Sequence, residues 1–253
     1  MPTRALLEVL ALWGIRRFKK PLALYHWTAR WQGLDAGRLL SCCRSRGGAV
    51  PRVSRATAAR HHEELIKAAA RLFRERGVAS VSCPDVMNEI GLTRGGFYKH
   101  FKTKDALVAA AVEAAFSEHL QRLASMSDQN SDDPVQTRRA FLDFCLSTAH
   151  RDDPANGCPS ALASAMAQAD PDGTPRAAYI EGERVMLAEL AERTGGDSND
   201  AEAQRERVLA DLSTLVGAVL LARATAGDPI SEDILTAARH RLERHDLTPA
   251  DGL

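Results

Sequence analysis

The chain has 253 residues, enough for two domains that each bury a core, and its 33 basic residues balance its 33 acidic ones. No apolar run approaches the roughly 18 residues of a membrane-spanning helix, and no cleavage site follows the short stretch 6–15, which argues against a membrane protein and a secretory signal. The five cysteines form no C-x-x-C pair, so neither a disulfide framework nor a zinc site is expected, and a cytoplasmic location fits them.

Charge is distributed unevenly along the chain. Residues 1–55 hold 11 Lys/Arg and 2 Asp/Glu, residues 56–104 hold 9 and 5, and residues 105–253 hold 13 and 26. A basic head and an acidic body suit an anionic polymer that is held at one end and repelled at the other. The alternative is that the acidic surface of the body is only solvated and has no partner.

Residues 1–55 form a basic extension without sustained periodicity, and they carry all three tryptophans, Trp13, Trp27 and Trp31. Two interpretations are open. The extension is an arm that adds contacts to phosphates, or it is not native and translation starts near Val50, which leaves about 204 residues. In the second case, deleting residues 1–49 leaves folding unchanged.

Three helices are predicted over the next fifty residues. The first spans 57–76, where apolar residues repeat at three- and four-residue spacing up to Gly77. Two short helices follow at about 84–90 and 94–100. Ser82 is a good N-cap that Asp85 can complete as a capping box, and Gly91 stops the helix because glycine accepts a positive φ. Such a pair, joined by a few residues that include a glycine, is the signature of a helix-turn-helix.

The last of these helices has the composition of a segment that enters a nucleic-acid groove. It begins with small and polar residues and continues with Tyr98, Lys99 and His100, which can donate to phosphates. Phe97 and Phe101 are expected to anchor it to its own domain. Lys104 lies in the first turn of the following helix, where the dipole disfavours a cation, so either phosphate binding explains it or it is simply solvated.

The run from Gly91 to Leu107, GLTRGGFYKHFKTKDAL, resembles the recognition region of the TetR/AcrR family of transcriptional regulators. The family pattern is roughly G-[VL]-[ST]-x-G-x-[FLI]-Y-x-[HY]-F-x-[ST]-K-x-x-L, every fixed position is met, and the likeness covers about residues 58–119. Ile90 stands where the family more often has a small residue, so slightly altered packing between the two helices is expected. The basic residues after Val50 look like the usual start of family members, which favours a non-native extension. The DNA-binding residues expected from the motif and the resemblance are Ser82, Thr93, Arg94, Gly95, Gly96, Phe97, Tyr98, Lys99, His100 and Lys104.

Only helices are predicted beyond residue 104. Their expected ranges are about 104–125, 134–150, 160–168, 175–194, 201–226 and 231–245, with a polar linker at 125–133 and turn clusters at 152–159 and 170–175. The expected fold is therefore all-α. Residues 56–104 form the three-helix DNA-binding domain with its motif at about 83–102, and residues 105–253 form a helical domain for effector binding and dimerisation.

The resemblance implies a cavity for a small-molecule effector in the helical domain. The candidate lining residues are Phe141, Phe144, Cys145, Met166, Tyr179, Met186 and Leu187, although aromatic and Met residues at helical spacing are more often plain core. No spacing suggests a metal site or a cofactor, and no catalytic constellation is evident, so the chain is not expected to be an enzyme. Cys158 is a lone cysteine, either structural or a redox sensor.

The last two long helices are expected to pair across a two-fold axis, as the resemblance implies. An apolar stripe with small residues beside it supports this, and the predicted interface residues are Val208, Leu212, Leu215, Val219, Ile234, Ala238 and Leu242. The expected function is a homodimeric regulator, a ligand-responsive repressor that binds double-stranded operator DNA. The alternative is an architectural or partner-binding DNA-binding protein without an effector.

Overall fold

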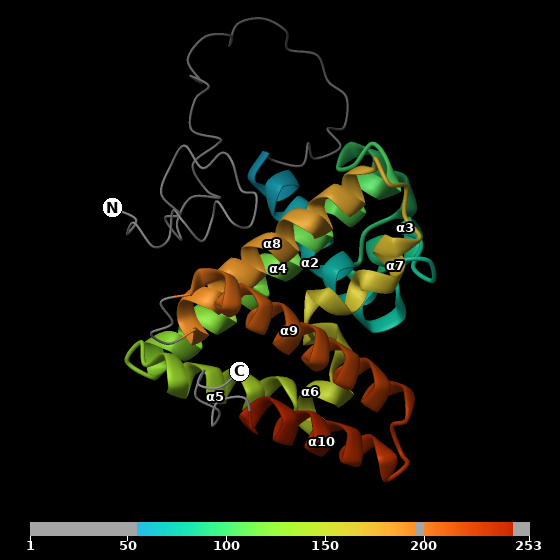
Figure 1. The fold of residues 1–253 in the computed structure, drawn as a ribbon. Helices are drawn as coiled ribbons and strands as arrows, with labels where there is room; N and C mark the ends of the chain where they lie inside the picture. Colours follow the sequence, from blue (N-terminus) through green and yellow to red (C-terminus); the bar gives the residue numbers. More distant parts are fainter. Residues whose placement is uncertain (1–54, 196–199, 245–253) are drawn as a thin grey trace, which may run out of the picture. The chain divides into compact units, whose positions relative to one another are not determined.

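The computed structural model describes residues 55–195 and 200–244, and every regular element in these two ranges is a helix (Figure 1). The elements are α2 (Arg55–Arg76), α3 (Cys83–Glu89), the 3-10 helix η2 (Arg94–Lys99), α4 (Lys104–Gln129), α5 (Pro134–Cys145), α6 (Thr148–Asp152), the 3-10 helices η3 (Pro154–Asn156) and η4 (Pro159–Leu162), α7 (Ala163–Ala167), α8 (Thr174–Thr194), α9 (Ala201–Ala224) and α10 (Ile230–Arg244). The predicted all-α fold is confirmed. The basic extension with its three tryptophans lies outside the described residues.

Helices α2, α3 and η2 form the basic head around a small apolar core. Leu65 and Phe73 of α2 and Val86 and Met87 of α3 are almost completely buried in it. Helix α2 ends just before Gly77, as predicted. The head is therefore built from local helical signals that the sequence already carries.

Helix α4 leads from the head into the helical body, where it lies along α8 over most of its length (Figure 1). Its buried face includes Leu107, Val112 and Phe116, and the ring of Phe116 meets Tyr179 of α8 edge-on at 5.6 Å between centroids. Helices α5 and α9 also pack on α8, and α10 packs on α9.

The prediction of a polar linker at 125–133 is wrong for its first half, because α4 continues to Gln129. Ser127 is buried, and its hydroxyl donates to Asp132 Oδ1 at 2.9 Å. The chain turns only at Ser131 and Asp132, which both have a positive φ. Polar residues at the end of a long amphipathic helix thus resemble a linker in composition although their backbone is helical.

The helix predicted at 134–150 is two helices, because α5 ends at Cys145 and α6 begins at Thr148. Ser147 is the N-cap of α6 and accepts a hydrogen bond from the amide of His150 at 3.0 Å. Its hydroxyl also donates to the carbonyl of Phe144. A capping serine inside an apolar stretch therefore ends one helix and starts the next.

No helix in the described ranges is long and apolar enough to cross a membrane.

Candidate nucleic-acid interface

The turn between α3 and η2 has the predicted caps. The amide of Ser82 donates to Asp85 Oδ2 at 2.8 Å and the amide of Asp85 donates back to Ser82 Oγ at 3.3 Å, which completes the capping box. At the other end of α3, Gly91 has a φ of +71°. The amide of Gly91 donates to Asn88 O and that of Leu92 to Met87 O, the pair of bonds of a Schellman motif.

The recognition segment, residues 94–99, is a 3-10 helix rather than the α-helix expected from the sequence. Thr93 occupies its N-cap position as predicted and is exposed, but its side chain makes no capping hydrogen bond. A Cβ on Gly96 would lie 3.1 Å from Met87 Cε, so the small residue lets this segment approach α3 closely.

Phe97 is only 3% exposed and packs near Phe101, which confirms it as an anchor. Its assignment to DNA contact is therefore wrong, because a buried ring cannot reach a groove.

The outer face of the recognition segment presents polar groups. Tyr98 is 78% exposed, so its hydroxyl is open to solvent. Its ring packs edge-on against the buried Phe97 ring, with 5.4 Å between centroids. Gly95 and Lys99 are exposed and His100 is half-buried. The side chain of Arg94 lies outside the described part of the structure. Gly95, Tyr98, Lys99 and His100 thus leave polar groups open to solvent along one short segment, as an interface with a nucleic acid requires.

Lys104 has a structural contact that the sequence did not indicate. Its ammonium donates to the carbonyl of Val78 at 2.8 Å and so ties the start of α4 to the loop after α2. An ammonium has three donors, so this bond leaves capacity for a phosphate oxygen. The assignment of Lys104 to phosphate contact stays a prediction.

His62 is a residue of the head that the predicted site did not include. Its ring stacks on Phe101 with 4.6 Å between centroids and lies 6.1 Å from the ring of His100. The sequence held a signal for this position, because His62 precedes Leu65 and Ile66 by three and four residues and therefore shares their face of α2. His61 lies next to it and is also half-buried.

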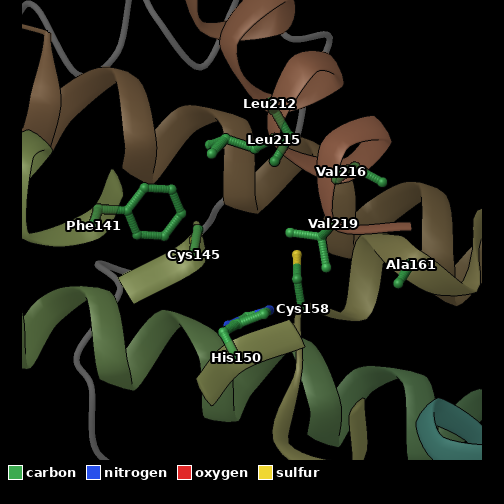
Figure 2. A pocket seen from close by; sticks show the side chains of 9 residues that line it. All are labelled: Phe141, Cys145, His150, Cys158, Ala161, Leu212, Leu215, Val216 and Val219. Carbon is green, nitrogen blue, oxygen red and sulfur yellow. The ribbon is translucent and has the colours of Figure 1, made fainter. Parts of the chain in front are cut away.

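A cavity in the body overlaps the predicted effector site only in part (Figure 2). Its lining residues are Phe141, Cys145, His150, Cys158, Ala161, Leu212, Leu215, Val216 and Val219. Figure 2 shows residues of α5 facing residues of α9, with Cys158 and His150 below them in this view. The side chains leave room at its centre for about one water molecule.

Five of the seven predicted lining residues lie elsewhere. Met166, Met186 and Leu187 are buried as ordinary core. The hydroxyl of Tyr179 donates to Glu183 Oε1 at 2.6 Å, and the Phe144 ring lies under the guanidinium of Arg122 at 4.8 Å. These five residues do not line this cavity, because helical spacing identifies a buried face but not the neighbour that faces it, and their assignment to an effector site stays a prediction.

The polar groups of this cavity do not form a reactive pair. Burial raises the pKa of the Cys145 and Cys158 thiols, which keeps both protonated. Burial, and then the charge of Arg223, lowers the pKa of His150 to about 4. Neither ring nitrogen of His150 has a hydrogen-bond partner among the described residues. The arrangement favours a structural Cys158 over a redox sensor, since the thiolate is the reactive form.

Most of the predicted dimer residues are buried inside the monomer. Val208, Leu212, Leu215, Val219, Ala238 and Leu242 are each at most 9% exposed, and Ile234 is half-buried. The buried six pack within the protomer, so the assignment of their side chains to a contact surface is corrected. Large apolar side chains that are exposed on α9 and α10 are Leu220, Leu221 and Ile230.

The fold and the capped turn define a helix-turn-helix protein, and the comparisons show which known proteins it resembles. Residues 65–111 match the model of bacterial regulatory proteins of the tetR family. The chain is 33% identical over 79 residues to the HTH-type transcriptional regulator TtgR of Pseudomonas putida, a match that covers 31% of this chain and 38% of TtgR. It is 27% identical over 194 residues to the uncharacterized HTH-type transcriptional regulator Rv0196 of Mycobacterium tuberculosis, a match that covers 75% of this chain and 88% of that protein. The helix-turn-helix part of the chain, residues 65–111, is therefore similar to the tetR family of bacterial regulatory proteins, as the recognition motif predicted.

Solved structures share the fold. A TetR transcriptional regulator from Legionella pneumophila superposes with a TM-score of 0.62 at 21% identity, over 72% of this chain and 96% of that one. A TetR-family regulator from Agrobacterium tumefaciens gives 0.59 at 23% identity, over 74% and 97%. The chain spans only about a quarter to two fifths of the length of three of the curated relatives that it matches. These relatives are named as transcriptional regulators.

Proposed function

We propose that the protein is a sequence-specific DNA-binding regulator, a repressor that acts as a homodimer and responds to a small molecule. The observation that carries the proposal is the recognition segment, which a capping box and a Schellman motif hold in place with Tyr98 and Lys99 facing solvent. Tyr98, Lys99 and His100 donate to phosphates, and Thr93 lies where it can reach a base edge.

Dimerisation supplies the second half of the operator contact. Leu220 and Leu221 of α9 and Ile230 of α10 are 40%, 58% and 50% exposed in the monomer, although they are large and apolar. These side chains lie close along one helical hairpin, which suits a self-complementary contact about a two-fold axis. Two heads at a fixed separation would then bind a pseudopalindromic operator.

The effector site is the cavity between α5 and α9. Its lining is almost entirely apolar, so it favours an uncharged ligand. Because the cavity holds about one water molecule, a larger effector must first separate the two helices, and that movement would couple binding to the spacing of the heads. The same small volume favours the alternative function, an architectural or partner-binding DNA-binding protein without an effector.

A footprint on the DNA upstream of the protein's own gene tests the proposal. We expect protection of a pseudopalindromic site, and we expect Tyr98→Ala to weaken the complex about tenfold or more, because it removes an exposed donor from the contact surface. Val135→Ala is the matched control, since Val135 is also largely exposed but lies on α5. Equal loss in both variants, or no protected site, would contradict the assignment.

Repeating the footprint with extracted metabolites separates the two functions. Release of the DNA by one fraction supports the ligand-responsive repressor. Unchanged protection in every fraction supports the architectural alternative.

A further inference from the structure

Three histidines gather where α2 meets the end of the recognition segment. His62 of α2 stacks between Phe101, at 4.6 Å, and His100, at 6.1 Å, with interplanar angles of 17° and 27°. His61 is the neighbour of His62 on α2. All three rings are half-buried, so each keeps one edge in contact with solvent. We call His61, His62 and His100 the imidazole cluster.

The charged groups that act on His100 are positive or titrate towards positive. The groups that act on His100 are His61 and His62 from α2 and Lys99 from the recognition segment. No carboxylate of the described residues acts on His100. Glu63 and Glu64 follow His62 on α2, and Glu64 lies 3.6 Å from the guanidinium of Arg60, so an anion beside His100 finds donors while the nearest of these carboxylates has a basic partner.

We propose that the imidazole cluster, with Lys99, is a phosphate-binding site that takes up a proton when the operator binds, so that operator affinity rises as the pH falls from 7.5 to 6.0. This inference rests on the proposed DNA-binding function and adds His61 and His62 to the contact residues.

The sign of the effect follows from the electrostatics. Burial, and then the charges of His62, His61 and Lys99, lower the pKa of His100 in the free protein, so its ring is mostly neutral at neutral pH. A phosphate oxygen beside the ring favours the protonated form and raises that pKa. Binding then takes up protons between the lower free pKa and the higher bound pKa, and affinity increases by up to about tenfold per pH unit for each proton.

The positions of the rings explain why proton uptake and phosphate binding are coupled at His62 and His100. The His62 ring stacks on Phe101, and its centroid lies 6.1 Å from that of His100, so a phosphate that contacts one imidazole stands close to the other. A single backbone phosphate can thus bind two imidazoles, and protonation of either ring strengthens the same contact. Phosphates carry no sequence information, so the effect should be the same on specific and unrelated DNA.

Fluorescence anisotropy with a labelled operator duplex at constant ionic strength tests the proposal. We expect the dissociation constant to fall about tenfold between pH 7.5 and 6.0 for the unaltered protein. The double variant His62→Gln/His100→Gln should change less than about twofold over the same range, by the same linkage. His240→Gln, an exposed histidine on α10, is the matched control and should behave as the unaltered protein does.

The lower limit of pH 6.0 keeps a separate effect in the body small. Burial is the main cause that lowers the pKa of His119 to about 3 and that of His150 to about 4. Their unfolded-state pKa lies near 6.5, so the unfolded chain binds more protons below that value and stability falls with the pH. Circular dichroism at each pH verifies that the protein is still folded.

A second measurement is independent of the variants. The proton resonances of the histidine rings give the pKa of His100 in the free protein and with a saturating DNA duplex. We expect the DNA to raise it, and an unchanged value would overturn the proposal. Tight DNA binding that does not depend on pH would overturn this inference alone, whereas absence of DNA binding at every pH would overturn the proposed function and the inference with it.

Discussion

Arg74 shows how one residue connects the head to the body. Its side chain is only 2% exposed, although the two residues that follow it on α2, Glu75 and Arg76, are exposed. One guanidinium nitrogen donates to Glu118 of α4 at 2.8 Å and another to the carbonyl of Gly157 at 3.4 Å. A buried cation needs such partners, since burial without them is costly. The sequence offered no sign of this role, because Arg74 and Arg76 look alike in a basic stretch.

We expect Arg74→Ala to lower the free energy of unfolding by about 1–3 kcal/mol, because it removes buried hydrogen bonds to a charged group. Arg76→Ala is the control, since the Arg76 side chain is 56% exposed and its change should cost less than about 0.5 kcal/mol. Urea denaturation measures both. Similar losses in the two variants would contradict the role of Arg74.

At the scale of helices, what the sequence could predict depended on the distance between the interacting residues. The capping box at Ser82 and the stop at Gly91 involve neighbours within a few residues, and both are confirmed. The break before α6 was missed because a single serine inside an apolar run decides it. The cavity lining was predicted for only two residues, since α5 meets α9 through contacts about seventy residues apart. The apolar stripe on α9 was expected to be buried against a second protomer, whereas it is buried within its own protomer.

The turn of the helix-turn-helix depends on Gly91. Its φ of +71° lies in the left-handed region, where a side chain costs about 1–2 kcal/mol. We expect Gly91→Ala to reduce the free energy of unfolding by about that amount and to weaken operator binding with it. Gly95→Ala is the control for stability, because Gly95 has no positive φ and open space around it. Thermal unfolding of the two variants distinguishes the backbone effect from simple loss of a glycine.

At the scale of the whole molecule, arginines from three helices converge on residues 150–157. Arg74 of α2 donates to Gly157 O, Arg122 of α4 to Asn156 O at 3.1 Å, and Arg223 of α9 to the carbonyls of His150 and Arg151 at 2.9 and 3.0 Å. The segment ends just before Cys158, which lines the cavity. One short segment therefore touches the head, the helix that leads from it, the cavity and the proposed dimer helix.

The proposed dimer contact also belongs to this scale. We expect Leu221→Glu to give a folded monomer that has lost operator affinity, since Leu221 is 58% exposed in the protomer. Val219→Glu would instead place a charge in the protomer core, where Val219 is 5% exposed. Ile180→Glu, at an exposed position on α8, is the control. Sedimentation and gel shift measure assembly and DNA binding, and a dimeric Leu221→Glu protein would contradict the contact.

The three arginines bind the main chain of residues 150–157 and not its side chains. A carbonyl oxygen is present whatever residue carries it, so these contacts would survive most substitutions at Ala155 or Asn156. Gly157 differs, because a Cβ there would lie 2.6 Å from Arg223 Nη2. Side chains on the rim of the cavity can thus change without breaking these hydrogen bonds. The attachment of the rim to the head depends only on the three arginines and on Gly157.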